Sequence, residues 1–361
     1  EEVVGTTIDF NRAGVPLMEL VTEPVITSAK QAGDFARELQ LLLRYLGASN
    51  ANMEKGEMRV EANVSVAPKA TPSSAKESPL GTKVEIKNLN SFRAMERAVE
   101  YEIARQSDML ERGEKVVQET RGWDESKQST FPQRVKEGSA DYRYFPDPDL
   151  PSLKLSEIPE YQGDALMAGM PELPWQRRER YNTLGLKTDD ADMFVRQPGY
   201  GRLFDSAIVP WGSGDARVAL AANFVANNVA GLRDANARDS EFSAEMPMDP
   251  ENLGSLINML FERKVSSQGA KEILSRVLES GRAPEVIAAE QNLLKIDDQK
   301  SLEDIVTSVL SAHGAVVAEL RGGKVAALQF LIGQAMKIAR GAADPTVLRT
   351  LIEKKIAETI S

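Results

Sequence analysis

The spacing of apolar residues changes along this chain, and the change limits the folds that it can adopt. Residues 59–66 (RVEANVSV) and 83–87 (KVEIK) alternate polar and apolar side chains one by one, which is typical of half-buried β-strands. From about residue 176, apolar residues recur at helical spacing instead. The pattern predicts an α+β fold: a domain with a mixed or antiparallel sheet over 1–175, an all-α helical domain over 176–290 and a small helical tail over 291–361.

Serine and glycine residues mark the expected helix ends in the first domain. Ser28 and Gln31 match a capping box, and Gly47 is the expected stop of that helix. Its apolar residues recur at helical spacing: Phe35, Leu39, Leu42 and Leu46. Ser91 and Gly113 bound a second predicted helix, and residues 115–136 read as a hairpin.

Similar signals recur in the second half. Asp249 before Pro250, and Asp344 before Pro345, combine a capping carboxylate with proline in the first turn. Ser266 is a further expected N-cap, and Gly281 is the expected end of that helix. These caps predict three helices in the helical and tail regions.

The composition excludes several classes of site. The chain has no cysteine, which rules out disulfides and thiolate metal ligands within these residues, and its one histidine, His313, cannot assemble a histidine-rich site. No apolar run reaches the roughly 20 residues of a membrane span. The net charge of −10 argues against nonspecific coating of nucleic acid, although a local basic face could still dock one structured RNA.

The first candidate site is the polar face of the two predicted strands. Arg59, Glu61 and Asn63 share one side of their strand, and Lys87 lies on the matching side of the other. Carboxylates, lysine and arginine at this spacing can hold a magnesium–phosphate unit. A solvated face with cross-strand ion pairs is the alternative, and spacing alone favours it.

Two further stretches carry candidate residues. Glu19 is the lone charge in an apolar run (LMELV) after Asn11 and Arg12, so it is either paired, bound to a cation or at a cleft edge. In RVKEGSADYRYFPDPDLP (134–151), aromatic residues interleave with cations such as Arg143. Such a pattern can stack on the bases of a single-stranded RNA end, or can be plain packing at a domain boundary.

Several long motifs, in order, resemble the B subunit (GatB) of the tRNA-dependent amidotransferases over essentially the whole chain. The matching stretches include DFNRAGVPLMEL, MEKGEMRVEANVS, GTKVEIKNLNSF, RVKEGSADYRYFPDPDLP and GKVAALQFLIGQAMKIARGAADP. The resemblance implies a ligase component that uses ATP and Mg²⁺ to phosphorylate the side chain of Glu-tRNA(Gln) or Asp-tRNA(Asn). Ammonia from the partner amidase, the A subunit, then displaces the phosphate, and a small C subunit clasps the other two together. The bacterial cytoplasm or an organellar matrix is the expected location.

The resemblance also assigns roles to residues. It implies metal binding by Glu19 and Glu61, although the family often has aspartate at the latter position. The residues expected to act in catalysis are Glu61, Lys87 and Arg59. Those expected to bind ATP or substrate are Asn11, Arg12, Asn63 and Arg143. On a predicted tail helix, a shared face away from the apolar stripe nominates three cations for the tRNA body: Lys324, Lys337 and Arg340.

The implied fold is the C-terminal portion of the family's cradle domain, then a helical domain and a tail of the YqeY type. Because the chain opens at Glu1 with a strand-like run, we expect cradle residues upstream, an apolar sheet edge near residues 1–10, and no amidation by this chain alone. A noncatalytic tRNA-docking scaffold is therefore an alternative function for the chain in isolation. An unrelated ATP-dependent ligase is a third hypothesis.

Overall fold

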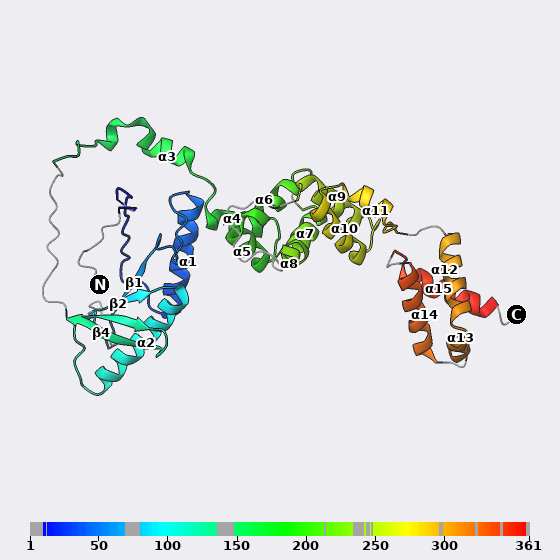
Figure 1. Cartoon of the computed structure of the whole chain (residues 1–361), viewed down its shortest axis with the longest axis horizontal. Helices are drawn as coiled ribbons and strands as arrows, with labels where there is room; N and C mark the ends of the chain where they lie inside the picture. Colours follow the sequence, from blue (N-terminus) through cyan, green and yellow to red (C-terminus); the bar gives the residue numbers. More distant parts are fainter. Residues whose placement is uncertain are drawn as a thin grey trace, which may run out of the picture. The chain divides into compact units, whose positions relative to one another are not determined.

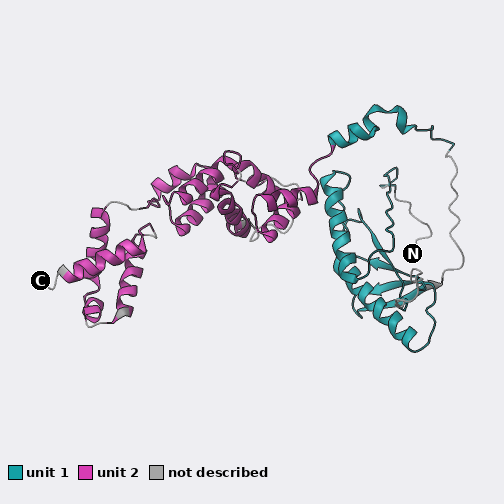
Figure 2. Cartoon of the chain, turned by 180° about the vertical axis from the view of Figure 1, so that it is seen from behind, with its two compact units in different colours: residues 1–169 teal, residues 170–361 magenta. Residues whose placement is uncertain are grey.

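The structure is a computed structural model, and it divides the chain into two compact units, residues 1–169 (unit 1) and 170–361 (unit 2) (Figure 2). The predicted boundaries at 175/176 and 290/291 stay predictions. The structure describes residues 10–11, 13–68, 80–135, 148–212, 214–233, 242, 246, 248–295, 299–321, 324–339 and 342–358.

Unit 1 is built on a mixed four-stranded sheet in the order β1-β2-β3-β4 (Figure 1). Its strands are β1 (Val60–Val64), β2 (Val84–Leu89), β3 (Glu119–Asp124) and β4 (Ser129–Val135). β1 pairs antiparallel with β2, β2 parallel with β3, and β3 antiparallel with β4 through the predicted hairpin. A parallel pair needs a crossover connection. The helix α2 (Phe92–Glu111) supplies it, so the mixed sheet expected from the sequence is present.

α2 covers one face of the sheet, and α1 (Ala29–Tyr45) packs beside it (Figure 1). Their shared core joins side chains from both helices and three strands, and its buried members are Ala36, Val64, Ile86, Leu89, Ala94, Met95, Ala98, Val99 and Trp123. Both predicted N-caps are confirmed: Ser28 Oγ accepts from Gln31 N at 3.2 Å, and Ser91 Oγ accepts from Ala94 N at 3.0 Å. The predicted capping box is not closed, because Gln31 Oε1 accepts from Thr27 N at 2.9 Å instead of from Ser28 N.

The four apolar residues at helical spacing are not the most buried residues of α1. Phe35 and Leu46 are about two-fifths exposed, whereas the residues that the helix buries are Gly33, Ala36 and Leu41. The reason is the partner: α1 lies against α2, and small side chains let two helices approach closely.

The remainder of unit 1 consists of short or irregular pieces. Residues 13–28 have no regular element and are mostly exposed, with Leu17 at 93%. Two 3₁₀ turns and a short helix follow the sheet, and their bounds are Leu155–Glu157, Pro159–Tyr161 and, for α3, Gly163–Gly169. None of these three elements buries a residue.

Unit 2 is helical in its described part. Its first helices are α4 (Pro174–Thr183), α5 (Thr188–Arg196), α6 (Pro198–Ala207), α7 (Ala216–Phe224), α8 (Ala230–Arg233), α9 (Pro250–Phe261), α10 (Ser267–Ser280) and α11 (Pro284–Glu290), with a π-helical turn at Val225–Val229. Three fully buried rings, Tyr181, Phe194 and Phe204, pack with centroids 5.1–5.8 Å apart. They fix α4, α5 and α6 against one another.

The last four helices have a core of their own. They are α12 (Gln299–Ala312), α13 (Gly314–Arg321), α14 (Val325–Ile338) and α15 (Pro345–Glu358). Their buried residues include Leu328, Leu331, Ile332 and Leu348. No described helix is long and apolar enough to cross a membrane.

The caps expected in unit 2 are confirmed. Asp249 and Ser266 accept hydrogen bonds from the first turns of α9 and α10, and Asp344 accepts one from Thr346 N at 2.8 Å. Gly281 ends α10 at φ = 68°, in the left-handed region that favours glycine.

Candidate active site

The sheet of unit 1 has one apolar and one charged face. On β1, Ala62 is half-buried and Val64 is buried against the helices, while Glu61 and Asn63 are exposed on the opposite side. On β2, Ile86 is fully buried, and its neighbours Glu85 and Lys87 point away from the core. Asn63 pairs directly with Glu85 across the two strands. The predicted alternation is therefore confirmed, and both strands contribute to one polar face.

Lys87 joins two carboxylates on this face. Its Nζ lies 3.0 Å from Glu61 Oε1 and 3.8 Å from Glu85 Oε1. Thr120 on β3 donates from its hydroxyl to Glu85 Oε2 at 2.8 Å, which holds that carboxylate in place. The side chains of Glu61 and Lys87 are 46% and 33% exposed, so a ligand can reach both. Glu85 was part of the predicted polar pattern, but nothing in its spacing distinguished it from the other polar residues of the strand.

Two buried polar side chains of α2, Gln106 and Glu102, connect this helix to the sheet through hydrogen bonds. Gln106 donates from Nε2 to Val64 O at 3.2 Å, and its Oε1 accepts from Val66 N at 3.0 Å. Glu102, one turn earlier, is fully buried and accepts hydrogen bonds from Gln106 Nε2 and Thr130 Oγ1 at 2.9 and 3.1 Å. Sequence reasoning missed both residues. The only sign in the sequence was their position. Glu102 and Gln106 follow Val99 by one and two helical turns, so they lie on the same buried side of α2.

The other predicted site residues are dispersed or lie outside the described part. Arg59 is exposed immediately before β1, next to the charged face. Glu19 and Asn11 are exposed in the irregular stretch before α1, and no hydrogen bond or ion pair links Glu19 to Glu61 or Lys87 in the described part of the chain. Their convergence stays a prediction. Three predicted residues lie outside the described residues: Arg12, Arg143 and Arg340.

The residues of the charged face fit magnesium only if substrate oxygens supply part of its ligands. Among the described residues, no three acidic or histidine side chains gather closely enough to hold a metal by themselves. Glu61 and Glu85 nevertheless both reach Lys87. Mg²⁺ is commonly bound through one or two carboxylates plus substrate phosphates and water. The donor set on this face matches that mode and does not match a metal cage made by protein alone.

Two of the three nominated tail cations can be placed. Lys324 precedes α14 and binds Glu319 Oε2 at 2.8 Å, with 63% of its side chain exposed. Lys337 is exposed in the last turn of the same helix, where a cation also complements the carbonyl end of the helix dipole. Both side chains are therefore open to solvent.

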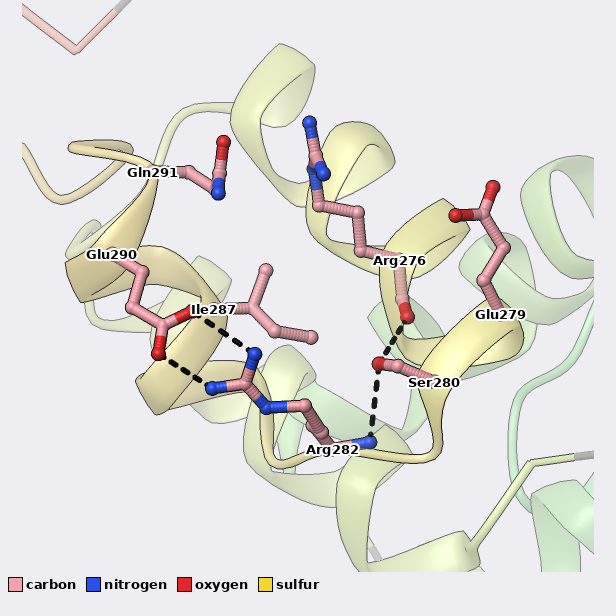
Figure 3. A pocket seen from close by; sticks show the side chains of 7 residues that line it. All are labelled: Arg276, Glu279, Ser280, Arg282, Ile287, Glu290 and Gln291. Atoms are coloured by element: carbon pink, nitrogen blue, oxygen red, sulfur yellow. Dashed lines mark hydrogen bonds and ion pairs between the residues drawn. The ribbon is translucent and has the colours of Figure 1, made fainter.

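A small pocket lies between α10 and α11 of unit 2 (Figure 3). Its lining residues are Arg276, Glu279, Ser280, Arg282, Ile287, Glu290 and Gln291. Arg282 is held by Glu290, with Nη2 and Oε1 2.5 Å apart, as the close-up shows. This pocket contains none of the predicted site residues, and its charges already neutralise each other, so we place the candidate chemistry on the sheet.

Comparison with known proteins accounts for most of the chain. Residues 1–159 match the GatB/GatE catalytic domain, and residues 212–356 match the GatB domain of the YqeY type. The B subunit of the aspartyl/glutamyl-tRNA(Asn/Gln) amidotransferase of Trichodesmium erythraeum is 41% identical over 97% of this chain and 68% of its own length. The proteins of that name from Gloeothece citriformis and Synechococcus sp. (strain WH7803) are 39% and 41% identical over 99% of this chain and 70% of theirs. The chain therefore belongs to the GatB family, the B subunits of these amidotransferases.

Proposed function

We propose that the charged face of the unit 1 sheet activates the side-chain carboxylate of glutamyl- or aspartyl-tRNA at the expense of ATP. The family to which the chain belongs forms part of a tRNA-dependent amidotransferase, a ligase complex of several subunits. One observation supports the assignment to this face. Glu61, Glu85 and Lys87 cluster within reach of solvent, inside the region that matches the catalytic domain.

The proposed reaction has two steps. A carboxylate oxygen of the aminoacyl side chain attacks the γ-phosphorus of ATP, the bond to ADP breaks, and an acyl phosphate forms. Ammonia then attacks the acyl carbon, phosphate leaves with the bonding electrons, and the nitrogen loses a proton to give the amide. Negative charge grows on phosphoryl and acyl oxygens in both steps, so a fixed cation beside them lowers the barrier. Lys87 supplies that cation.

The roles of the remaining face residues follow from their chemistry. Glu61 and Glu85 would hold Mg²⁺ together with phosphate oxygens, and the ion would neutralise charge on the phosphoryl group. Asn63, opposite Glu85, offers a neutral amide donor to substrate oxygens. Arg59 provides a second cation at the edge of the face. Glu19, Asn11, Arg12 and Arg143 keep the metal- and substrate-binding roles proposed for them.

The partners follow from the same proposal. Ammonia has to come from a separate amidase, because the reaction consumes it and none of the described residues on the charged face releases it. A third, small protein would complete the heterotrimer, and the substrate is tRNA(Gln), tRNA(Asn) or both. The exposed tail cations Lys324 and Lys337, with Arg340, would contact the tRNA body, because phosphate contacts position a nucleic acid without reading its sequence.

The decisive test is Glu61→Gln in the complete protein assembled with its partner proteins. The amide keeps the shape of the side chain but removes the charge that binds Lys87 at 3.0 Å. We expect acyl-phosphate formation and amidation to fall by about 100-fold or more, the usual effect of losing one electrostatic group in an active site. Glutamine hydrolysis by the amidase should persist.

Glu114→Gln is the matched control. Glu114 is 51% exposed and pairs with Arg112 at 2.9 Å, so its ion pair resembles that of Glu61 but lies away from the charged face. This variant should retain amidation. Wild-type acyl-phosphate formation by Glu61→Gln would move the chemistry away from this face. Charged-tRNA binding without any activation in the wild-type complex would instead favour the docking scaffold.

A further inference from the structure

The pairing of β1 with β2 contains an irregularity beside the charged face. Val60 pairs with Leu89, and Ala62 pairs with Ile86. The step between these two pairs is therefore two residues along β1 but three residues along β2. Glu61 alone therefore faces two residues, Lys87 and Asn88. This is a β-bulge, in which one strand carries an extra residue that bends it and redirects its side chains.

The backbone of Asn88 identifies the extra residue. Its φ is +62°, in the left-handed region that side chains other than glycine rarely adopt. Four other described non-glycine residues have positive φ, and all of them lie in turns or connections: Ala51, Gln128, Arg263 and Asn292. In the described part of the chain, Asn88 is the only such residue inside a strand. Asparagine tolerates this conformation better than most residues.

The bulge changes which side chains reach the charged face. In a regular strand, residues 86 and 88 would share one side and residues 87 and 89 the other. Here Ile86 and Leu89 are both buried, at 0% and 5% exposed, while Lys87 and Asn88 both lie outside the core. The bulge therefore adds one polar side chain to the face without removing an apolar one from the core.

The added side chain is available to a ligand. Asn88 is exposed, and its carboxamide makes no hydrogen bond to another described residue. By contrast, Lys87 beside it forms ion pairs with both Glu61 and Glu85. A local strain of this kind is retained where the surrounding structure enforces it, and such positions concentrate at functional sites.

We infer that Asn88 is a substrate-binding residue of the charged face, and that the bulge exists to present it. Its Nδ2 would donate to an anionic oxygen of the substrate beside Lys87. The side-chain carboxylate of the aminoacyl-tRNA and the phosphoryl group of ATP share this chemistry. The inference rests on the proposed function, because it needs that substrate on this face.

The test separates the side chain of Asn88 from its backbone. Asn88→Gly keeps a residue that adopts positive φ freely, and removes only the carboxamide. In the complete complex we expect kcat/KM for amidation to fall about 10-fold or more, the effect of one hydrogen bond to a charged group. A rise in KM for aminoacyl-tRNA alone would assign the contact to the carboxylate, and a rise in KM for ATP alone would assign it to the phosphoryl group.

Two further variants keep the result decisive. Asn88→Asp retains the size of the side chain but puts a negative charge beside Glu61 in place of the donor, so it should lose more activity than Asn88→Gly. Gln128→Gly is the control, because Gln128 also has positive φ (50°) but lies in the β3–β4 turn. This control should keep wild-type kcat/KM. The midpoint of thermal unfolding, measured for each variant, reports any loss of folding.

The outcomes distinguish this inference from the proposed function. Wild-type kcat/KM for both substrates in Asn88→Gly would overturn the inference and reduce Asn88 to a backbone role. If Glu61→Gln still loses activity in that case, the proposed function stands without Asn88. If Glu61→Gln and Lys87→Gln are both fully active, the face is not the active site and both proposals fail.

Discussion

Replacing Tyr181 by phenylalanine removes a single oxygen from a network of hydrogen-bonded polar side chains in unit 2. The ring is fully buried between Phe194 and Phe204. Its hydroxyl accepts from Arg177 Nε at 2.9 Å and donates to Asp205 Oδ2 at 3.1 Å. Arg177 and Arg180 supply the other hydrogen bonds to the same carboxylate, at 2.7–3.0 Å. The substitution leaves the shape of the core intact and removes two hydrogen bonds to charged groups.

The magnitude follows from those two bonds. A hydrogen bond to a charged group contributes roughly 1.5–3 kcal/mol. Asp205 keeps its hydrogen bonds from Arg177 and Arg180, and Arg177, only 8% exposed, also lies with its Nε 3.8 Å from Glu172 Oε2. We expect the free energy of unfolding to fall by about 2–4 kcal/mol. Urea unfolding followed by near-ultraviolet circular dichroism measures it, because the packed aromatic rings contribute to that signal.

The same hydroxyl predicts that the free energy of unfolding falls at alkaline pH. Burial, followed by the negative charge of Asp205, raises the pKa of Tyr181 above its ordinary value. The stabilisation is therefore fully present below pH of about 10, where a free tyrosine starts to ionise, and is lost as the pH rises further. In wild type, one tyrosine should ionise only with unfolding, and the Tyr181→Phe variant should lack that late step.

The exposed Tyr161 provides the control for both measurements. It is 53% exposed, so Tyr161→Phe should leave the free energy of unfolding unchanged and should keep the late step of Tyr181. A loss below about 0.5 kcal/mol in Tyr181→Phe, the range of ordinary surface substitutions, would show that the hydroxyl bonds contribute little net stability. That result would refute the reasoning.

Two other predictions concern charges in unit 2. The hydrogen bonds from the Arg217 side chain lower the pKa of Asp215, the N-cap of α7, to about 2. The stabilisation from these hydrogen bonds is fully present above the pKa of about 3.9 of an unfolded aspartate, and it is lost as the pH falls through about 2. An NMR titration of the wild type and of Asp215→Asn measures this loss. Neutralising Lys337 and Arg340 to glutamine should raise KM for charged tRNA and reduce the salt slope of binding by about two, without changing glutaminase activity. Lys154→Gln, 69% exposed in unit 1, should leave both quantities unchanged, and an unaltered slope in the double variant would assign the patch to solvent.

Local signals in the sequence predicted the ends of elements well. Ser91, Asp249 and Ser266 cap the helices that they were expected to cap, because an N-cap depends only on its own first turn. The buried face of α1 does not follow from its own sequence, for the opposite reason. Which side of a helix is buried depends on its partner, and α2 selects Gly33 and Ala36 for close approach over the larger Phe35.

The parts of the candidate site that depend on local patterns were predictable, and the parts that depend on contacts between distant segments were not. Strand alternation placed Glu61 and Lys87 on one polar face, since a period of two needs no tertiary knowledge. The bulge at Asn88 was not predictable, because it is a property of the pairing between two strands and leaves each strand's own pattern almost unchanged. Gln106 was missed likewise, since the backbone groups that it binds lie 40 and 42 residues earlier in the chain.

The charged groups around Lys87 and those around Asp205 both pair cations with carboxylates, but they differ in how easily a ligand could replace one of the partners. Asp205 accepts four hydrogen bonds, two of them from the buried residues Arg177 and Tyr181, so breaking its contacts costs more than breaking an exposed pair. The pair between Lys87 and Glu61 is a third to a half exposed, and such pairs contribute about 0–1 kcal/mol, so a substrate oxygen can replace Glu61 as the partner of Lys87 at little cost. Exchange of partners is what a phosphoryl-transfer site requires, because its charges must move from one oxygen to another. Solvent exposure therefore favours the sheet face over the denser cluster of unit 2 as the place where the chemistry occurs.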